Sequence, residues 1–147
     1  MGMRTFVVLI GILAVLAAAP AAMVGLRTSS GTVTVHTSSY GRILFDGRGF
    51  ALYTFSHDPR GRSSCSGACA TAWPPYLVKR APRAGRGLNG SLLGSVRRAD
   101  GTTQVTYAGR PLYYYVGDRK AGQVLCQGVS QFGGRWLVVR ANGVPVR

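Results

Sequence analysis

Three cysteines are the residues of this chain most able to do chemistry. Cys65 and Cys69 are four positions apart, and Cys126 comes much later in the chain. Three cysteines allow three single disulfides, each of which leaves one thiol over. One helical turn would place the Cα atoms of Cys65 and Cys69 about 6 Å apart, near the upper end of the range for a disulfide. The cysteines therefore predict either a structural disulfide with a spare thiol, or a redox pair or soft-metal site with Cys126 as a third ligand.

Few other side chains could assist such chemistry. The chain has two histidines and four aspartates but no glutamate. His57 and Asp58 are candidate metal ligands, although no recognised ligand spacing links them to the cysteines. Asp58 and Asp118 could pair as general acid and base. No serine, histidine and acid set stands at an interpretable spacing, and no G-x-S-x-G is present, so we predict a protein that is not an enzyme and has no cofactor.

The strongest pattern in the chain is an internal repeat. The first copy has Leu-Tyr-Thr-Phe-Ser-His-Asp at residues 52–58, and the second has Leu-Tyr-Tyr-Tyr-Val-Gly-Asp at residues 112–118. A glycine, a cysteine and a tryptophan follow each copy in the same order. The repeated residues predicted to have structural roles are Tyr53, Phe55, Asp58, Trp73, Tyr113, Tyr115, Asp118 and Trp136. A duplicated pattern explains such residues as architecture before any of them is assigned to catalysis.

The elements around the repeated residues predict an all-β fold. We expect a small domain of two similar β-hairpin-based halves, with a short helical turn near the cysteine pair. In each copy, two apolar runs flank a glycine-containing turn. Asp58 and Asp118 fall just past the return strands, where a carboxylate can accept backbone N–H bonds and hold the turn. The predicted domain covers residues 41–147, with repeat 1 at 41–78, a loop at 79–99 and repeat 2 at 100–140.

The N-terminal residues predict export. An apolar run behind a single arginine leads to Ala19-Pro20-Ala21, a reasonable cleavage tripeptide, so residues 1–22 are predicted to be a signal peptide. Residues 6–26 are also just long enough to span a bilayer, which makes an uncleaved membrane anchor the alternative. Residues 23–40, rich in serine and threonine, predict a flexible tether, in which Val33 and Val35 could form a short edge strand. The protein would then be secreted or held in the cell envelope, meeting a membrane only through its N-terminal segment.

The charge balance narrows the class of partner. Eighteen lysines and arginines stand against four acids, which gives a formal net charge of +14. Such a chain attracts polyanions, and export makes anionic envelope polymers and lipid head groups the relevant ones. No nucleic-acid-binding motif is present, so no specific nucleic acid is predicted. Most aromatic residues are needed as core, but Tyr114 alternates away from Tyr113 and Tyr115 and is a candidate exposed ligand contact.

Both copies of the repeat fit the pattern Y-x-[FWY]-x-x-D. The first is followed by Cys-Ser-Gly-Ala-Cys-Ala and Trp-Pro-Pro, and the second is flanked by Gly-Arg-Pro-Leu-Tyr and Gly-Gly-Arg-Trp. Together these segments resemble the bacterial secreted-repeat proteins, also described as predicted lipoproteins, over residues 41–140. The resemblance implies an uncharacterised cell-envelope protein, favours the Cys65–Cys69 pair and carries an association with alkane utilisation. The chain departs from the pattern at Cys126, where another residue is expected, and it has no cysteine near residues 1–22 for lipid attachment.

The leading hypothesis is an exported, non-enzymatic binding or structural module of unknown ligand, whose basic surface faces anionic envelope material. The main alternative is a thiol redox or metal-handling envelope protein that uses Cys65, Cys69 and Cys126. A further alternative, from the resemblance alone, is an accessory role in alkane utilisation.

Overall fold

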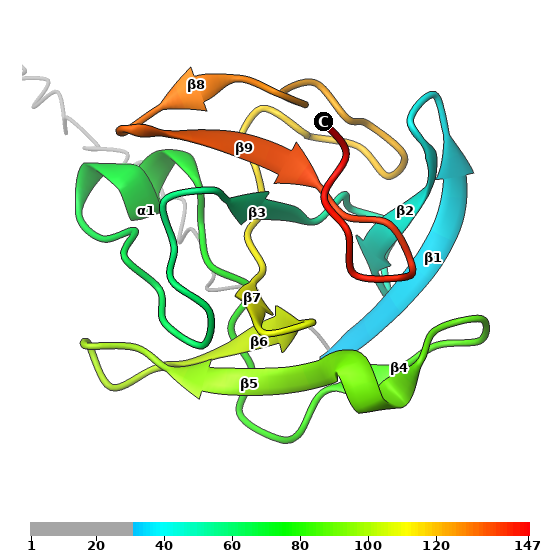
Figure 1. Cartoon of the computed structure of the whole chain (residues 1–147), viewed down its shortest axis with the longest axis horizontal. Coiled ribbons are helices and arrows are strands. Elements are labelled where there is room, and N and C mark those ends of the chain that lie inside the picture. The colour runs from blue at the N-terminus through cyan, green and yellow to red at the C-terminus, as the bar shows by residue number, and fades with distance from the viewer. Residues whose placement is uncertain (1–30) are drawn as a thin grey trace, which may run out of the picture.

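The computed structural model describes residues 31–147, and its regular secondary structure is almost entirely short strands joined by turns and loops (Figure 1). The strands are β1 (Thr32–Ser38), β2 (Gly41–Asp46), β3 (Tyr53–Phe55), β4 (Arg83–Ala84), β5 (Leu93–Arg97), β6 (Thr103–Tyr107), β7 (Arg110–Pro111), β8 (Ser130–Gln131) and β9 (Gly134–Val138). The helical elements are α1 (Ala68–Ala72) and the 3-10 turn η1 (Gly90–Leu92). The all-β prediction is confirmed, and the short helix lies beside the cysteine pair as expected.

The strands form three three-stranded sheets, ordered β2-β1-β4, β3-β9-β8 and β5-β6-β7. β1 and β2 form an antiparallel pair with Val35 opposite Leu44, and β5 and β6 form a second pair with Ser95 opposite Val105. Each of these pairs opens one copy of the repeat. We call residues 32–76 the first half and residues 93–139 the second half.

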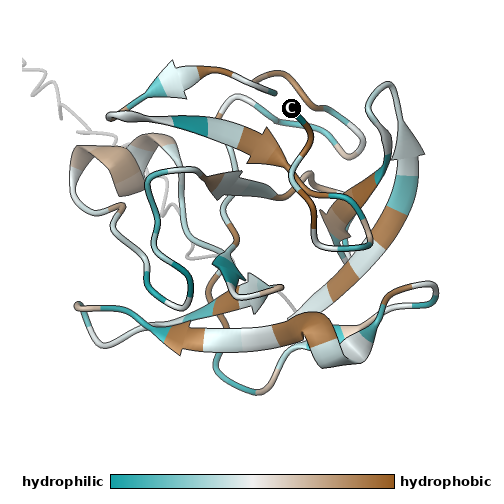
Figure 2. Ribbon diagram, viewed as in Figure 1, coloured by the Kyte–Doolittle hydropathy of each residue, from teal (hydrophilic) through white to brown (hydrophobic). Residues whose placement is uncertain are grey.

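Both halves begin earlier than the sequence predicted. β1 starts at Thr32 and Val33 is fully buried, so the tether prediction is wrong for residues 32–38. The strand predicted at Val33 and Val35 is present, but it is longer than expected and lies between β2 and β4 instead of at an edge. Valine and threonine alternate along β1 (Figure 2), and these β-branched side chains suit a strand, whereas their composition suggested a linker. β5 starts at Leu93, inside the loop predicted at 79–99. The predicted signal peptide or anchor at 1–22, and the tether up to residue 30, lie outside the described residues.

The strands that carry the repeated tyrosines pair across the two halves. The first predicted hairpin closes near its turn, where Phe45 stands opposite Ala51. From Tyr53 onward, however, β3 pairs with β9 of the second half, and Tyr113 pairs with Pro75 of the first half. The hairpin prediction therefore holds only near the turns. Alternation shows which residues share a face, but it does not show which strand lies alongside.

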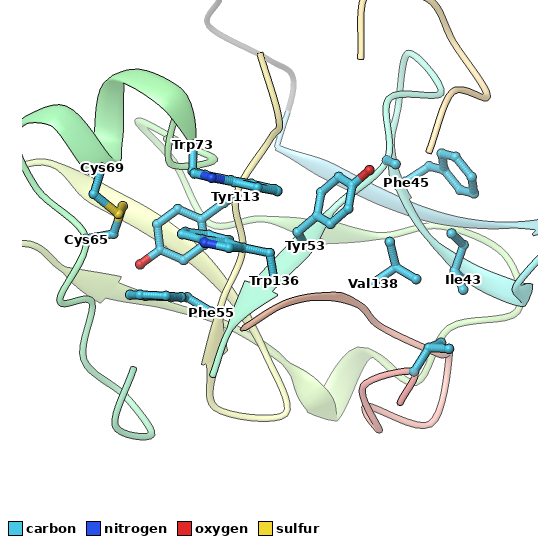
Figure 3. Close-up of a cluster of buried hydrophobic side chains, with 12 residues drawn as sticks. Ile43, Phe45, Tyr53, Phe55, Cys65, Cys69, Trp73, Tyr113, Trp136 and Val138 are labelled. Atoms are coloured by element: carbon cyan, nitrogen blue, oxygen red, sulfur yellow. A yellow bond between two sulfur atoms is a disulfide. The ribbon is translucent and has the colours of Figure 1, made fainter. Parts of the chain in front are cut away.

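Two buried clusters fill the interior, and both halves contribute to each. One contains the repeated aromatic residues, the disulfide, and apolar strand residues such as Ile43 and Val138 (Figure 3). The other contains residues of β1, β2 and β6, including Val33, Leu44 and Val105. Because apolar burial is shared in this way, neither half has a core of its own, and we expect the domain to fold as one unit.

Candidate functional site

The two repeated tyrosines meet at the centre of the domain. The Tyr53 N–H donates to the Tyr113 carbonyl oxygen and the Tyr113 N–H donates to the Tyr53 carbonyl oxygen, both at 2.9 Å. Both residues are fully buried. Two residues that exchange both backbone hydrogen bonds form a hydrogen-bonded antiparallel pair. In such a pair, a local two-fold axis relates the two chain segments. The centre of the fold is therefore a symmetric junction between the two copies of the motif.

The tyrosine side chains continue this exchange. The Tyr53 hydroxyl donates to Asp118 Oδ2 at 2.7 Å, and the Tyr113 hydroxyl donates to Asp58 Oδ2 at 2.6 Å. Each tyrosine thus bonds the aspartate of the other copy, not the aspartate of its own. Hydrogen bonds from a hydroxyl to a carboxylate are short and strong. The first and last residues of the Y-x-[FWY]-x-x-D pattern are therefore the two ends of a reciprocal clamp.

Burial keeps the hydroxyl groups of Tyr53 and Tyr113 protonated. Desolvation, reinforced by the Asp118 carboxylate, raises the pKa of Tyr53, and desolvation with the Asp58 carboxylate raises the pKa of Tyr113. Both hydroxyls therefore remain protonated donors at neutral pH. Burial also raises the pKa of Asp118, against the lowering effect of the hydrogen bonds from Tyr53 and the Leu125 backbone.

The second oxygen of each aspartate holds the turn that follows it. Asp58 Oδ1 accepts from the Ser64 N–H and hydroxyl, both at 2.7 Å, and Asp118 Oδ1 accepts from the Leu125 N–H at 3.0 Å. The predicted role as turn anchors is therefore present in both copies. Each carboxylate is therefore engaged both by a tyrosine and by a turn. The sequence held no signal for the cross-copy partner, since the tyrosine and aspartate that bond are far apart in the chain.

The other repeated aromatic residues form a stack of rings that packs against the two tyrosines. The stack runs Phe55, Trp136, Trp73 and Tyr115, with successive ring centroids 4.3, 4.1 and 4.7 Å apart. Figure 3 shows Phe55, Trp136 and Trp73 lying parallel. Tyr53 meets Trp73 edge-on at 5.3 Å, and Tyr113 meets Trp136 edge-on at 5.1 Å. The stack alternates between halves, and such ring pairs add stability beyond the burial of their area.

The cysteines divide into a bonded pair and a free thiol. Cys65 and Cys69 form a disulfide with their Cα atoms 5.3 Å apart, as the first interpretation predicted. Cys126 is free and half-buried, and it packs against the aromatic cluster. Its hydrogen bond to the Tyr115 hydroxyl raises the pKa of that tyrosine. Cys126 occupies the place in the second copy that Cys65 occupies in the first.

The candidate metal ligands do not gather. His57 is exposed, and its ring lies 5.7 Å from that of Phe55. Within residues 31–147, no three histidine, cysteine, aspartate or glutamate side chains are grouped closely enough to hold a metal ion. The soft-metal arrangement of the second interpretation also loses Cys65 and Cys69, because their sulfurs are joined to each other.

Tyr114 is not the exposed contact that alternation predicted. It is half-buried, its ring lies 5.3 Å from that of Tyr76, and its hydroxyl donates to Asp46 Oδ2 at 3.0 Å. Tyr113 and Tyr115 face one buried cluster and Tyr114 packs against the other, so neither side of this segment is open to solvent. Asp46 itself is fully buried and forms an ion pair with Arg48 at 2.7 Å. The sequence does not predict that Asp46 is a buried ion-pair partner, because an aspartate followed by glycine is typical of an exposed turn.

The charged side chains on the surface of the described residues are almost all cationic. The exposed basic residues are Arg42, Arg48, Arg60, Arg62, Lys79, Arg80, Arg83, Arg86, Arg97, Arg119, Lys120, Arg135, Arg140 and Arg147. Among the four aspartates, only Asp100 is exposed. The other three are buried or half-buried and serve internal hydrogen bonds. The folding of the acids inward therefore leaves a surface even more basic than the composition indicates.

One open depression lies beside the β8–β9 hairpin. It has a volume of about 570 Å³ and is lined by Ser56 and residues 130–135. Phe132 is 47% exposed there and has a φ of 55°, a left-handed conformation that is unusual for phenylalanine. Phe132 and Gly133 form the two-residue turn between the paired residues Gln131 and Gly134. The depression is shallow and open, so its geometry alone does not define a ligand.

The fold and its centre define a class: a β domain made of two copies of one motif, joined by reciprocal tyrosine–aspartate bonds. The model of a family described as a secreted repeat of unknown function matches residues 34–76 and 94–140, more than half of the chain. The chain therefore belongs to this secreted-repeat family. No curated protein and no solved structure matches it. Within residues 31–147, the helices are too short to cross a membrane.

Proposed function

We propose that the protein is an exported, non-enzymatic module that binds anionic polymers of the cell envelope through its basic surface. The observation that carries this proposal is the separation of charge: the described surface presents arginines and lysines, with Asp100 as its one exposed aspartate. Such a surface raises the local concentration of polyanions and speeds their association. Membership of a secreted family makes envelope polymers and lipid head groups the polyanions that it would meet.

The internal groups support a binding role over catalysis. The buried carboxylates, the tyrosine hydroxyls and the disulfide all serve contacts between elements of the fold. Groups committed in this way stabilise a rigid scaffold, and a rigid scaffold holds surface arginines at constant spacing. The proposal therefore places function on the surface and stability in the repeated motif.

Binding to an anionic polymer and to its neutral analogue tests the proposal. The exported protein should bind poly(glycerol phosphate) and vesicles containing phosphatidylglycerol, and it should not bind dextran or phosphatidylcholine vesicles. Its affinity should fall steeply as salt is raised, because the screening length shrinks to about 3 Å at 1 M ionic strength. Binding that is absent, or that is equal for neutral and anionic polymers, would refute the proposal.

The redox alternative now rests on Cys126 and its contact with Tyr115. Replacing Cys65, Cys69 and Cys126 together with serine separates the two functions. A binding module loses some stability and keeps its affinity for polyanions, whereas a redox protein loses its activity. An accessory role in alkane utilisation has no observation of its own in the structure.

A further inference from the structure

Two arginines lie at the turn between β6 and β7, and the C-terminal segment that carries a third, Arg147, packs against the same turn where Gly143 meets Ala108. Ala108 and Gly109 have φ values of 50° and 72° and form a two-residue turn, because Tyr107 pairs with Arg110 on either side of it. The Arg60 guanidinium lies against this turn and donates to the Ala108 carbonyl oxygen at 2.9 Å. The Gly61 N–H bonds the Gly109 carbonyl oxygen at 2.8 Å. Arg60 is thus held beside Arg110, although the two are far apart in sequence.

The charge of Arg110 is left uncompensated. Its side chain is half-buried, and its Nε is buried without a hydrogen-bond partner. Burial lowers the pKa of Arg110, and the nearby positive charges of Arg60 and Arg147 lower it further. In residues 31–147 the ion pairs are Arg48–Asp46 and Arg98–Asp100, so none of these three arginines faces a carboxylate partner. A desolvated cation beside two like charges gains more from an external anion than a solvated surface arginine does.

The equivalent turn at Arg48 and Gly49, between β2 and β3, shows that the cluster does not follow from the repeat. There the Gly122 N–H bonds the Gly49 carbonyl oxygen at 2.8 Å, in the same way as Gly61 bonds Gly109. Lys120 takes the place of Arg60, but Phe50 takes the place of Arg110. The neighbouring Arg48 lies over the Phe50 ring at 5.2 Å and is neutralised by Asp46. The turn between β6 and β7 therefore carries arginines without a carboxylate partner, whereas at its counterpart the arginine is neutralised by Asp46 and the exposed Lys120 is the remaining cation.

From this contrast we propose that Arg60, Arg110 and Arg147 form a discrete binding site for the phosphate group of an envelope polymer or lipid. The inference deepens the proposed function and rests on it for the source of the phosphate. A planar guanidinium donates two parallel hydrogen bonds to a phosphate, and several arginines converge on its oxygens from different sides. The hydrogen bond from Arg60 to Ala108 sets one of these groups in place before the ligand arrives.

The test compares matched removals of charge. Arg110→Gln and Arg147→Gln each remove one positive charge from the cluster, and Lys120→Gln removes one from the counterpart turn. Each variant is first checked for an unchanged urea midpoint, and Arg147→Gln serves as the informative variant if Arg110→Gln unfolds. Binding of poly(glycerol phosphate) and of phosphatidylglycerol vesicles is then measured at one salt concentration. We expect the cluster variants to lose about tenfold or more in affinity, the magnitude of a charged hydrogen bond, and Lys120→Gln to lose about twofold.

Inorganic phosphate separates this site from the wider proposal. Titrated phosphate should shift the amide NMR signals of Ala108, Gly109 and Arg110 in the wild type, and the shifts should vanish in Arg110→Gln. If the signals respond while neither polymer nor vesicles bind, the site stands and the proposed function fails. If all three variants lose the same affinity, binding is diffuse and the site is refuted while the proposed function stands. If phosphate shifts none of these NMR signals, the site is refuted. If it does shift them, the tighter binding of either the polymer or the vesicles identifies the source of the phosphate.

Discussion

The two halves of the domain agree at the tyrosine junction and differ away from it. At the junction, Tyr53 and Tyr113 exchange backbone bonds, and each hydroxyl binds the aspartate of the other half. Away from the junction, one half has a disulfide where the other has the free Cys126, and one turn has Arg110 where the other has Phe50.

This difference separates architecture from candidate function. A contact made twice by duplicated residues is explained by the need to join the two copies. A feature present in one copy is not explained by that need, so a binding role is best tested there. At the symmetric junction, equivalent substitutions in the two copies should lower the free energy of unfolding by similar amounts. At the asymmetric features, substitutions in the two copies should have different effects.

The largest effect should come from the tryptophans. Trp73 and Trp136 are both fully buried, and each contacts three other rings. Trp73→Ala and Trp136→Ala should each lower the free energy of unfolding by about 3–5 kcal/mol, because each leaves a large cavity in the stack. Urea denaturation followed by circular dichroism measures both. If one variant loses less than half as much free energy of unfolding as the other, the two halves do not contribute equally to the stack.

The tyrosine hydroxyls should reveal an inequality within the symmetric clamp. Tyr53→Phe leaves one oxygen of the buried Asp118 without its donor and should cost about 1–3 kcal/mol. Tyr113→Phe should cost about 0.5–1.5 kcal/mol, because Asp58 is only half-buried and keeps both donors from Ser64. The same denaturation experiment tests the order. A larger loss in Tyr113→Phe would contradict the role that we assign to burial.

The disulfide of the first half should contribute more to stability than the free Cys126 of the second half. Replacing Cys65 and Cys69 with serine should cost about 2 kcal/mol, because a bridge between residues four apart closes a short loop. Cys126→Ser should cost about 0.5 kcal/mol or less, since this thiol is half-buried and unbonded to another cysteine. Thermal unfolding with and without reductant compares the two. A reductant effect that persists in the double variant would mean that the pairing is wrong.

The smallest effect concerns pH and the buried carboxylate. Burial raises the pKa of Asp118 in the folded protein, so its contribution to stability is fully present below its unfolded-state pKa of about 3.9 and is lost as pH rises through the folded value. Asp118→Asn removes this titration, so the advantage of the wild type over the variant should shrink as pH rises through that window. Urea denaturation across an acidic pH series measures the difference.

Asp100→Asn is the control of opposite sign for this experiment. Hydrogen bonds from Thr102 lower the pKa of Asp100, so the contribution of Asp100 is present above its unfolded-state pKa and is lost as pH falls. Parallel pH curves for the wild type and Asp118→Asn would show that the Asp118 carboxylate is not desolvated as the structure indicates.

Some of these features were predictable and others were not, for identifiable reasons. The turn-anchoring role of Asp58 could be predicted, because an aspartate just past a strand has local backbone donors within reach. The alternation at Val33 and Val35 predicts a short edge strand, but the surrounding serines and threonines are typical of linkers, so neither the length of β1 nor its place between β2 and β4 could be predicted. Alternation predicts an open face for Tyr114 because it identifies two faces and cannot show that both are covered.

The sequence by itself determined the all-β class, the duplicated motif and the basic charge, because strand periodicity, turn residues and composition are local properties. Only the tertiary structure decided which tyrosine bonds which aspartate, which cysteine stays free, and which arginines stand together without a carboxylate. These outcomes depend on contacts between residues far apart in the chain. A repeat makes such contacts ambiguous, because each motif could bond its own partner or that of its copy, and only the packing of the shared core selects between them.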